Sequence, residues 1–156
     1  MISLMNKLLF FIFLIVALAS CTTLDVYEKQ IPFPKHEWSS STRPVFNFTV
    51  QDTTSAYNFY VVLRHTDAYH FKNIWLNITV KFPDSTYTVK REFILADNTQ
   101  WLGSAMDDVI EHRLNFNALP IHLKKGNYQF TVEQIMREDP LQNFLNIGIR
   151  VEKVKP

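Results

Sequence analysis

Cysteine and glycine are both scarce in this chain. Its 156 residues include one cysteine, Cys21, and three glycines. A single thiol forms no internal disulfide and no thiolate cluster for zinc, and three glycines are too few for the loops that cradle phosphate groups. The sequence therefore argues against a disulfide framework, a zinc–thiolate site and a nucleotide-binding protein, and we expect no cofactor.

Excess charge of either sign is also missing. The chain has 16 basic and 15 acidic side chains, and Lys7 is the only charged residue among the first twenty. Nucleic-acid-binding domains usually carry a strongly basic face, which a balanced chain does not supply. We therefore expect no nucleic-acid partner.

The only cysteine directly follows an apolar run near the N-terminus. Lys7 precedes eleven apolar residues, 8–18. A membrane span needs ~20 such residues, so this run suits the hydrophobic part of a signal peptide better. Ala19 and Ser20 complete the sequence "LASC", which matches a bacterial lipobox. The sequence predicts a signal peptide over 1–20 and lipidation of Cys21 with fatty acyl chains such as palmitate; an ordinary secretory signal or an uncleaved anchor is the alternative.

Three segments follow from this interpretation. Removal of residues 1–20 from 156 would leave 136, enough for one domain. Thr22, rather than an aspartate, follows the cysteine and favours the outer membrane over the inner one. Residues 21–43, which include Pro32 and Pro34, suggest a lipidated tether partly packed on the domain. The domain itself is expected over 44–156.

Most of the aromatic residues lie in runs that alternate with polar residues. The chain has 13 Phe, 6 Tyr and 3 Trp, and this period of two is typical of half-buried strands. The expected strands cover 45–50, 57–65, 73–82, 87–95, 127–135 and 145–151, with a short edge strand within 116–126. The sequence predicts a mainly β fold, a single antiparallel β-sandwich of the jelly-roll or immunoglobulin-like kind.

The segment 104–113 departs from this alternation. Ser104 is a possible N-cap, and Val109 and Ile110 fall on one side of a helix. We expect one short helix or a structured loop here.

Acidic and histidine side chains concentrate in the same region. They form a candidate interaction surface that comprises Trp101, Asp107, Asp108, Glu111, His112 and Arg113. Helix capping with salt bridges is the simpler interpretation, and Arg64, Arg137 and Arg150 are possible ion-pair partners. His65, Asp67 and His70 lie close enough in sequence for a metal site, but their spacing matches no zinc pattern, so we assign no metal and no catalytic residues.

Several stretches occur together in one order that resembles a known family. They are "PKHEW" (34–38), "RHTDAYHFKNIWLN" (64–77), "WLGSAMDDVIEHR" (101–113), "QIMREDPL" (134–141) and "NIGIRVEK" (146–153). With the lipobox, this set resembles the gliding-motility lipoprotein H family, GldH. The resemblance implies an outer-membrane lipoprotein that faces the periplasm and serves gliding machinery coupled to type IX secretion. It also implies a structural or assembly role beside other envelope proteins, and not an enzyme.

A different class of function remains open. β-Sandwiches often bind glycans, and Trp38, Trp75 and Trp101 are candidate stacking platforms. The alternative is therefore a periplasmic carbohydrate- or peptidoglycan-binding lipoprotein.

Overall fold

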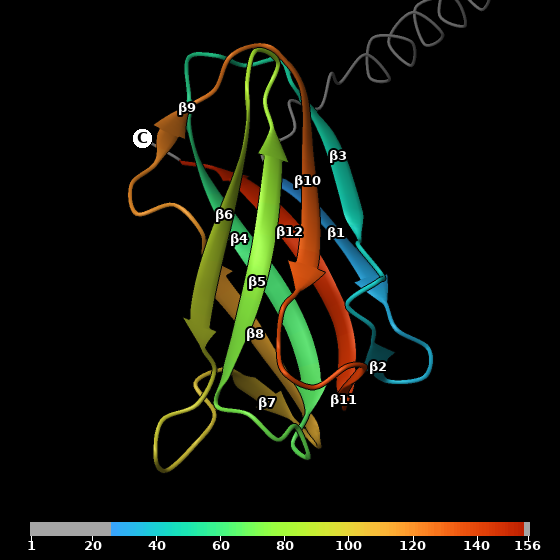
Figure 1. The fold of residues 1–156 in the computed structure, drawn as a ribbon. Helices are drawn as coiled ribbons and strands as arrows, with labels where there is room; N and C mark the ends of the chain where they lie inside the picture. The colour runs from blue at the N-terminus through green and yellow to red at the C-terminus, as the bar shows by residue number, and fades with distance from the viewer. Residues whose placement is uncertain (1–25, 155–156) are drawn as a thin grey trace, which may run out of the picture.

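The computed structural model describes residues 26–154, which form two antiparallel sheets packed face to face (Figure 1). The predicted antiparallel β-sandwich is therefore confirmed. The signal peptide at 1–20, Cys21 and the rest of the tether up to residue 25 lie outside the described residues.

The larger sheet has the order β1-β12-β4-β8-β7, with β9 paired to β4. The smaller sheet has the order β3-β10-β5-β6, and β2 pairs separately with β11. The bounds are β1 Val26–Pro32, β2 Glu37–Trp38, β3 Val45–Val50, β4 Ala56–Thr66, β5 Asn73–Lys81, β6 Thr86–Ile94, β7 Ser104–Met106, β8 Val109–Asn115, β9 Ile121–His122, β10 Gly126–Gln134, β11 Leu141–Gln142 and β12 Phe144–Lys153.

Alternating side chains from both sheets fill the core. Along β5 every second residue is buried, as the sequence period predicts. Rings dominate the interior: Phe59 packs on Phe130 with centroids 5.3 Å apart, and Phe48 stacks on Tyr128 at 5.2 Å. The sandwich thus holds a large apolar core.

Strand β1 belongs to the larger sheet, although the sequence places its residues in the tether. It pairs with β12 in register from Val26 opposite Glu152 to Pro32 opposite Asn146. Further along the expected tether, Phe33 and Trp38 are buried and stack on each other. The described part of the tether, from Val26 onward, is therefore built into the domain.

The helix considered for 104–113 is wrong, because this segment is the β7–β8 hairpin. Asp107 and Asp108 form its two-residue turn, and Asp107 adopts a φ of 53°. Such hairpin turns require positive φ, which aspartate tolerates better than most residues. In β8, Ile110 and His112 are buried while Glu111 and Arg113 lie on the other face, so the period of two prevails.

A bulge interrupts the alternation of buried and exposed residues at the start of β12. The pairing with β4 shifts between Phe144, opposite His65, and Asn146, opposite Arg64. Leu145 is the extra residue and is only partly buried, whereas Phe144 is fully buried. A one-residue bulge changes which side chains face inward, so strict alternation from Leu145 misses Phe144.

The strand register defines two ends of the sandwich. Glu152 lies opposite both Val26 of β1 and Asn58 of β4, while Thr66, at the other end of β4, lies opposite Val109 of β8. Eight residue steps along β4 separate these ends by roughly 26 Å. The chain therefore enters the sandwich at one end, and the β7–β8 hairpin lies at the other. None of the residues from 26 to 154 belongs to a helix with the length and apolarity that crossing a bilayer requires.

Candidate functional site

The β7–β8 hairpin carries most of the predicted interaction surface. Asp107 and Asp108 are exposed in its turn, and Asp67 N–H donates a hydrogen bond of 2.8 Å to the carbonyl oxygen of Asp108. The exposed apolar side chain of Met106 directly precedes them and is 78% exposed. Leu102, 54% exposed, lies just before β7. The turn therefore presents both carboxylates and apolar surface to solvent.

Glu111 and Arg113 point outward from β8. Glu111 pairs across the strands with Arg64, whose Nε and Nη2 lie 2.6 Å and 2.5 Å from Oε2. The expected ion pair of Arg64 with this acidic region is thus confirmed. Arg150 instead bonds Glu28 and Glu152. These pairs support the geometry of the larger sheet.

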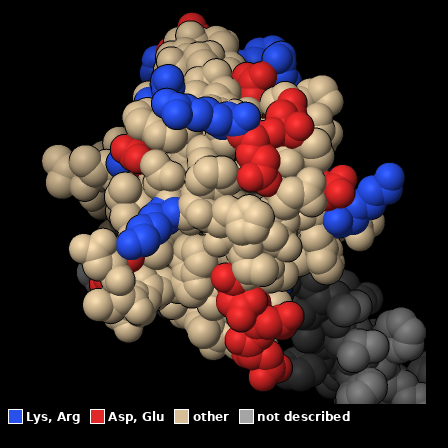
Figure 2. All heavy atoms as spheres, turned by 60° about the horizontal axis from the view of Figure 1, so that its bottom comes forward, with Lys and Arg blue, Asp and Glu red and all other residues tan. Residues whose placement is uncertain are grey.

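Figure 2 turns the hairpin end toward the viewer. Uncharged atoms cover much of this surface, most of the acidic side chains lie against basic ones, and one acidic group lies apart. No single sign of charge covers the face shown.

His112 does not belong to an exposed surface, which corrects the prediction. It is 2% exposed because β8 points it into the sandwich beside His65, which is fully buried. The two Nε2 atoms are 3.0 Å apart, and the rings stack with centroids 5.1 Å apart. The buried pair contributes to the interior rather than to a docking face.

The hydrogen bonds assign the tautomers of this pair. His65 Nδ1 lies 2.7 Å from the carbonyl oxygen of Thr66, which only accepts, so Nδ1 carries the proton. The bare Nε2 of His65 then accepts from the Nε2–H of His112. Burial lowers the pKa of both imidazoles, that of His112 to about 4 with a further contribution from His65. Both rings are therefore neutral at pH 7.

Aromatic rings close the space around His65. The Trp101 ring meets it edge-on at 4.5 Å between centroids, and the Tyr69 ring lies at 4.8 Å. Burial raises the pKa of Tyr69, whose hydroxyl donates to the carbonyl oxygen of Asn73. Trp101 is thus partly buried packing for the histidine pair.

The structure does not bring His65, Asp67 and His70 together as a metal site. His65 faces His112, whereas Asp67 and His70 are exposed. Over residues 26–154, no group of three or more His, Cys, Asp or Glu side chains is arranged to hold a metal ion.

The three tryptophans do not form one platform. Trp38 is fully buried, and its indole N–H donates to the carbonyl oxygen of Thr42, so it offers no face to a sugar. Trp101 packs on His65. Trp75 alone lies on the outer face of the smaller sheet, where alternation along β5 places it.

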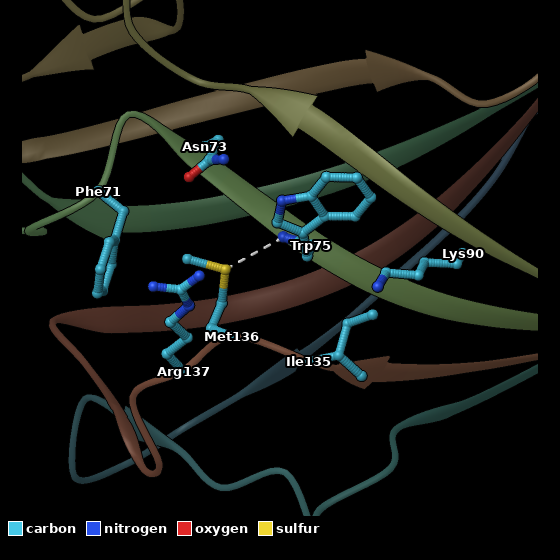
Figure 3. Close-up of a pocket in the computed structure, with 7 residues that line it drawn as sticks. All are labelled: Phe71, Asn73, Trp75, Lys90, Ile135, Met136 and Arg137. Atoms are coloured by element: carbon cyan, nitrogen blue, oxygen red, sulfur yellow. Dashed lines mark hydrogen bonds between the residues drawn. The ribbon is translucent and has the colours of Figure 1, made fainter.

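Trp75 lines a surface groove of about 450 Å³ (Figure 3), which we call the Trp75 groove. Its lining residues come from the start of β5, from β6 and from the segment after β10: Phe71, Asn73, Trp75, Lys90, Ile135, Met136 and Arg137. The sequence singled out Trp75 as a stacking platform and Arg137 only as an ion-pair partner, because the lining residues span more than sixty positions of the chain. The alternation of Trp75 with buried neighbours was the one available signal.

Sequence matches identify the family to which this chain belongs. The family described as GldH lipoprotein matches residues 25–151. The chain belongs to the GldH lipoprotein family. It is similar to a gliding motility lipoprotein GldH homolog of Christiangramia forsetii, with 27% identity over 92% of this chain and 93% of that protein. It is also similar to the gliding motility lipoprotein GldH of Flavobacterium johnsoniae, with 26% identity over 74% of this chain and 77% of that protein.

Among solved structures, a carbohydrate-binding module of the CBM28 type, specific for non-crystalline cellulose, aligns with a TM-score of 0.43 and 12% identity. The alignment covers 82% of this chain and 73% of that module. Membership of the GldH family rests on the sequence matches, which make the chain a gliding-motility lipoprotein.

Proposed function

We propose that this GldH lipoprotein is a structural or assembly component of gliding machinery coupled to type IX secretion. It is held on the outer membrane by acylated Cys21 and faces the periplasm. The observation that carries the proposal is the family match over residues 25–151, which spans all but the last two residues of the sandwich. The lipobox that ends at Cys21 supports the anchor.

The geometry supports a defined orientation on the membrane. Cys21 precedes Val26 by five residues, which reach at most about 18 Å when extended. Several acyl chains on one cysteine hold a protein firmly at a bilayer, whereas one chain does so only marginally. The end of the sandwich at Val26 would therefore lie near the membrane, and the β7–β8 hairpin would point away from it.

The hairpin is the surface that we assign to partner proteins of the envelope. Asp107 and Asp108 supply charge at its turn, and Met106 and Leu102 supply exposed apolar area. Protein interfaces commonly combine an apolar centre with a polar rim. A docking role needs no catalytic group, and the most perturbed histidines of the described residues are paired with each other in the interior.

Complementation of a clean deletion tests this proposal, scored by colony spreading and by the profile of secreted proteins. The wild-type gene is expected to restore both, and Cys21→Ala to fail although the protein is made and exported. Met106→Asp, at the hairpin, is expected to fail as well.

The matched control is Leu119→Asp, because Leu119 is 75% exposed, like Met106 at 78%, but lies in the loop at the other end. It is expected to complement. A deletion that changes neither phenotype would overturn the proposed role in motility and secretion, and equal behaviour of the two Asp variants would remove the hairpin as the docking surface.

A further inference from the structure

The Trp75 groove holds two cationic side chains without acidic partners. The Lys90 ammonium lies 5.0 Å from the centroid of the Trp75 ring, and neither Lys90 nor Arg137 forms an ion pair with any described residue. Figure 3 shows the Lys90 ammonium and the Arg137 guanidinium on two sides of the groove. Positive charge is therefore available to a ligand there.

Three carboxylates lie near the groove, and none of them forms an ion pair with Lys90 or Arg137. Glu92 accepts from the Asn73 amide at 2.5 Å, and Glu133 accepts from Arg43 at 2.7 Å. Glu138 accepts from the backbone N–H of Gln142 at 2.9 Å. Arg43 neutralises Glu133, whereas Glu92 and Glu138 keep their charge. The groove therefore offers a ligand two cations that are free of ion pairs, and not an excess of positive charge.

The apolar wall of the groove is fixed by backbone hydrogen bonds. The backbone N–H of Trp75 donates to Met136 Sδ at 3.2 Å, and the backbone N–H of Ile135 donates to the Trp75 carbonyl oxygen at 3.0 Å. The Met136 N–H in turn donates to Gln134 Oε1 at 2.8 Å. A wall that is already ordered loses little conformational entropy when a ligand binds.

The same sheet face continues as a row of polar side chains, most of them uncharged. Gln129 donates to Asn47 at 2.9 Å, and Thr49 donates to Asn127 at 2.8 Å. A second hollow of about 350 Å³ lies among them, lined by Asn47, Phe48, Thr49, Lys81, Asn127, Tyr128 and Gln129. Amides and hydroxyls on one sheet face, with the Trp75 ring on the same face, suit a chain of sugars better than an apolar peptide segment, which offers no hydrogen bonds in place of those to water.

We propose that the Trp75 groove binds a carboxylate-bearing, N-acetylated sugar, one unit of a glycan chain that continues over the outer face of β3-β10-β5-β6. The Trp75 ring stacks on the C–H face of the sugar, and Lys90 swings its ammonium from the ring to the carboxylate. Arg137 binds the same carboxylate through its planar fork of donors. Met136 and Phe71 contact the acetyl methyl group, and Asn73 Oδ1 accepts from a sugar hydroxyl.

Titration calorimetry of the full-length lipoprotein in detergent tests this site with three probes. The first is the disaccharide of N-acetylglucosamine and N-acetylmuramic acid, which carries a carboxylate. The second is N,N′-diacetylchitobiose, which has the acetyl groups without the carboxylate. The third is the dipeptide L-Ala-γ-D-Glu, which has carboxylates without sugar.

The acidic disaccharide is expected to bind about tenfold more tightly than diacetylchitobiose, because Lys90 and Arg137 together hold its carboxylate at an exposed site, and the dipeptide is expected not to bind. Trp75→Ala should abolish binding of both sugars. Lys90→Ala and Arg137→Ala should each remove most of the preference for the acidic sugar. The controls Lys125→Ala and Arg113→Ala, exposed cations outside the groove, should change nothing.

Equal affinity for the two disaccharides would overturn the role of the carboxylate. Binding of the dipeptide as tightly as the acidic disaccharide would replace the glycan by a peptide. Absence of binding by wild-type protein would overturn the site itself. Because Arg137→Ala removes only an exposed side chain, it keeps the test decisive if Trp75→Ala fails to fold. Complementation by the wild-type gene is a separate readout, so failure here would leave the role in motility untouched.

Discussion

The histidine pair and the Trp75 groove lie near the same end of the sandwich, and both combine rings with polar groups. In the first, His65 and His112 are buried and bond each other and a backbone carbonyl group. In the second, Lys90 and Arg137 reach solvent and have no carboxylate partner among the described residues. Buried polar groups such as the two imidazoles need hydrogen-bond partners within the fold. The exposed cations of the groove are solvated by water and remain free to bind a ligand.

The histidine pair is therefore expected to affect the stability of the fold, and the groove to affect ligand binding. Changes to the histidine pair are expected to alter the free energy of unfolding, since they leave a buried polar atom unpaired or open a cavity. Changes to the cations of the groove are expected to leave that free energy almost unchanged.

The largest effect is expected for His112→Ala. It removes a buried ring and leaves Nε2 of His65 without a donor, so the free energy of unfolding should fall by about 3 kcal/mol or more. Urea unfolding followed by fluorescence measures this change. The matched control is His122→Ala on β9, an exposed histidine, which should stay within about 0.5 kcal/mol of wild type. Equal stability of the two variants would show that the buried pair contributes nothing to the fold.

A slightly smaller effect is expected from acid. The folded-state pKa of both histidines lies below the ordinary 6.5, with that of His112 at about 4. The unfolded chain therefore takes up protons first, so the stabilisation is complete above pH 6.5 and is lost as the pH falls toward 4. Between pH 6.5 and 5, urea midpoints should report a loss on the order of 2 kcal/mol.

The variant His65→Gln, His112→Gln isolates the source of this acid sensitivity. It should flatten the dependence between pH 6.5 and 5, because ordinary carboxylates titrate mainly below that window. An unchanged slope in the double variant would assign the sensitivity to other groups.

The same two regions show how far the sequence leads. Alternation along β5 predicts that Ile74 is buried and that Trp75 lies on the opposite face, and the structure confirms both. Alternation holds in β8 as well, but Ser104 suggested a helix N-cap, because turns and helix caps favour the same residue types. The pairing of His65 with His112 depends on the register between β4 and β8, and nothing local to either residue specifies that register.

The Trp75 groove could not be predicted from the sequence for a related reason. Arg137 follows the end of β10, and Lys90 lies on β6, so their closeness depends on the sheet order β10-β5-β6. The sequence suggested Arg137 as an ion-pair partner for acidic residues. Arg137 forms no such pair among the described residues. Its guanidinium is therefore available to bind an anionic ligand in the groove.

The smallest effect is expected for Arg137→Ala, and its smallness is informative. An exposed arginine without an ion pair contributes little to folding, so the urea midpoint should correspond to a change within about 0.5 kcal/mol. Lys90→Ala should cost slightly more, about 0.5 to 1 kcal/mol, because it removes a cation over the Trp75 ring. A loss well above 1 kcal/mol for Arg137→Ala would mean that the guanidinium already has a structural partner, and the groove would then resemble the histidine pair rather than contrast with it. A near-neutral result leaves a positive charge that the fold does not use, which is the condition that an anionic ligand requires.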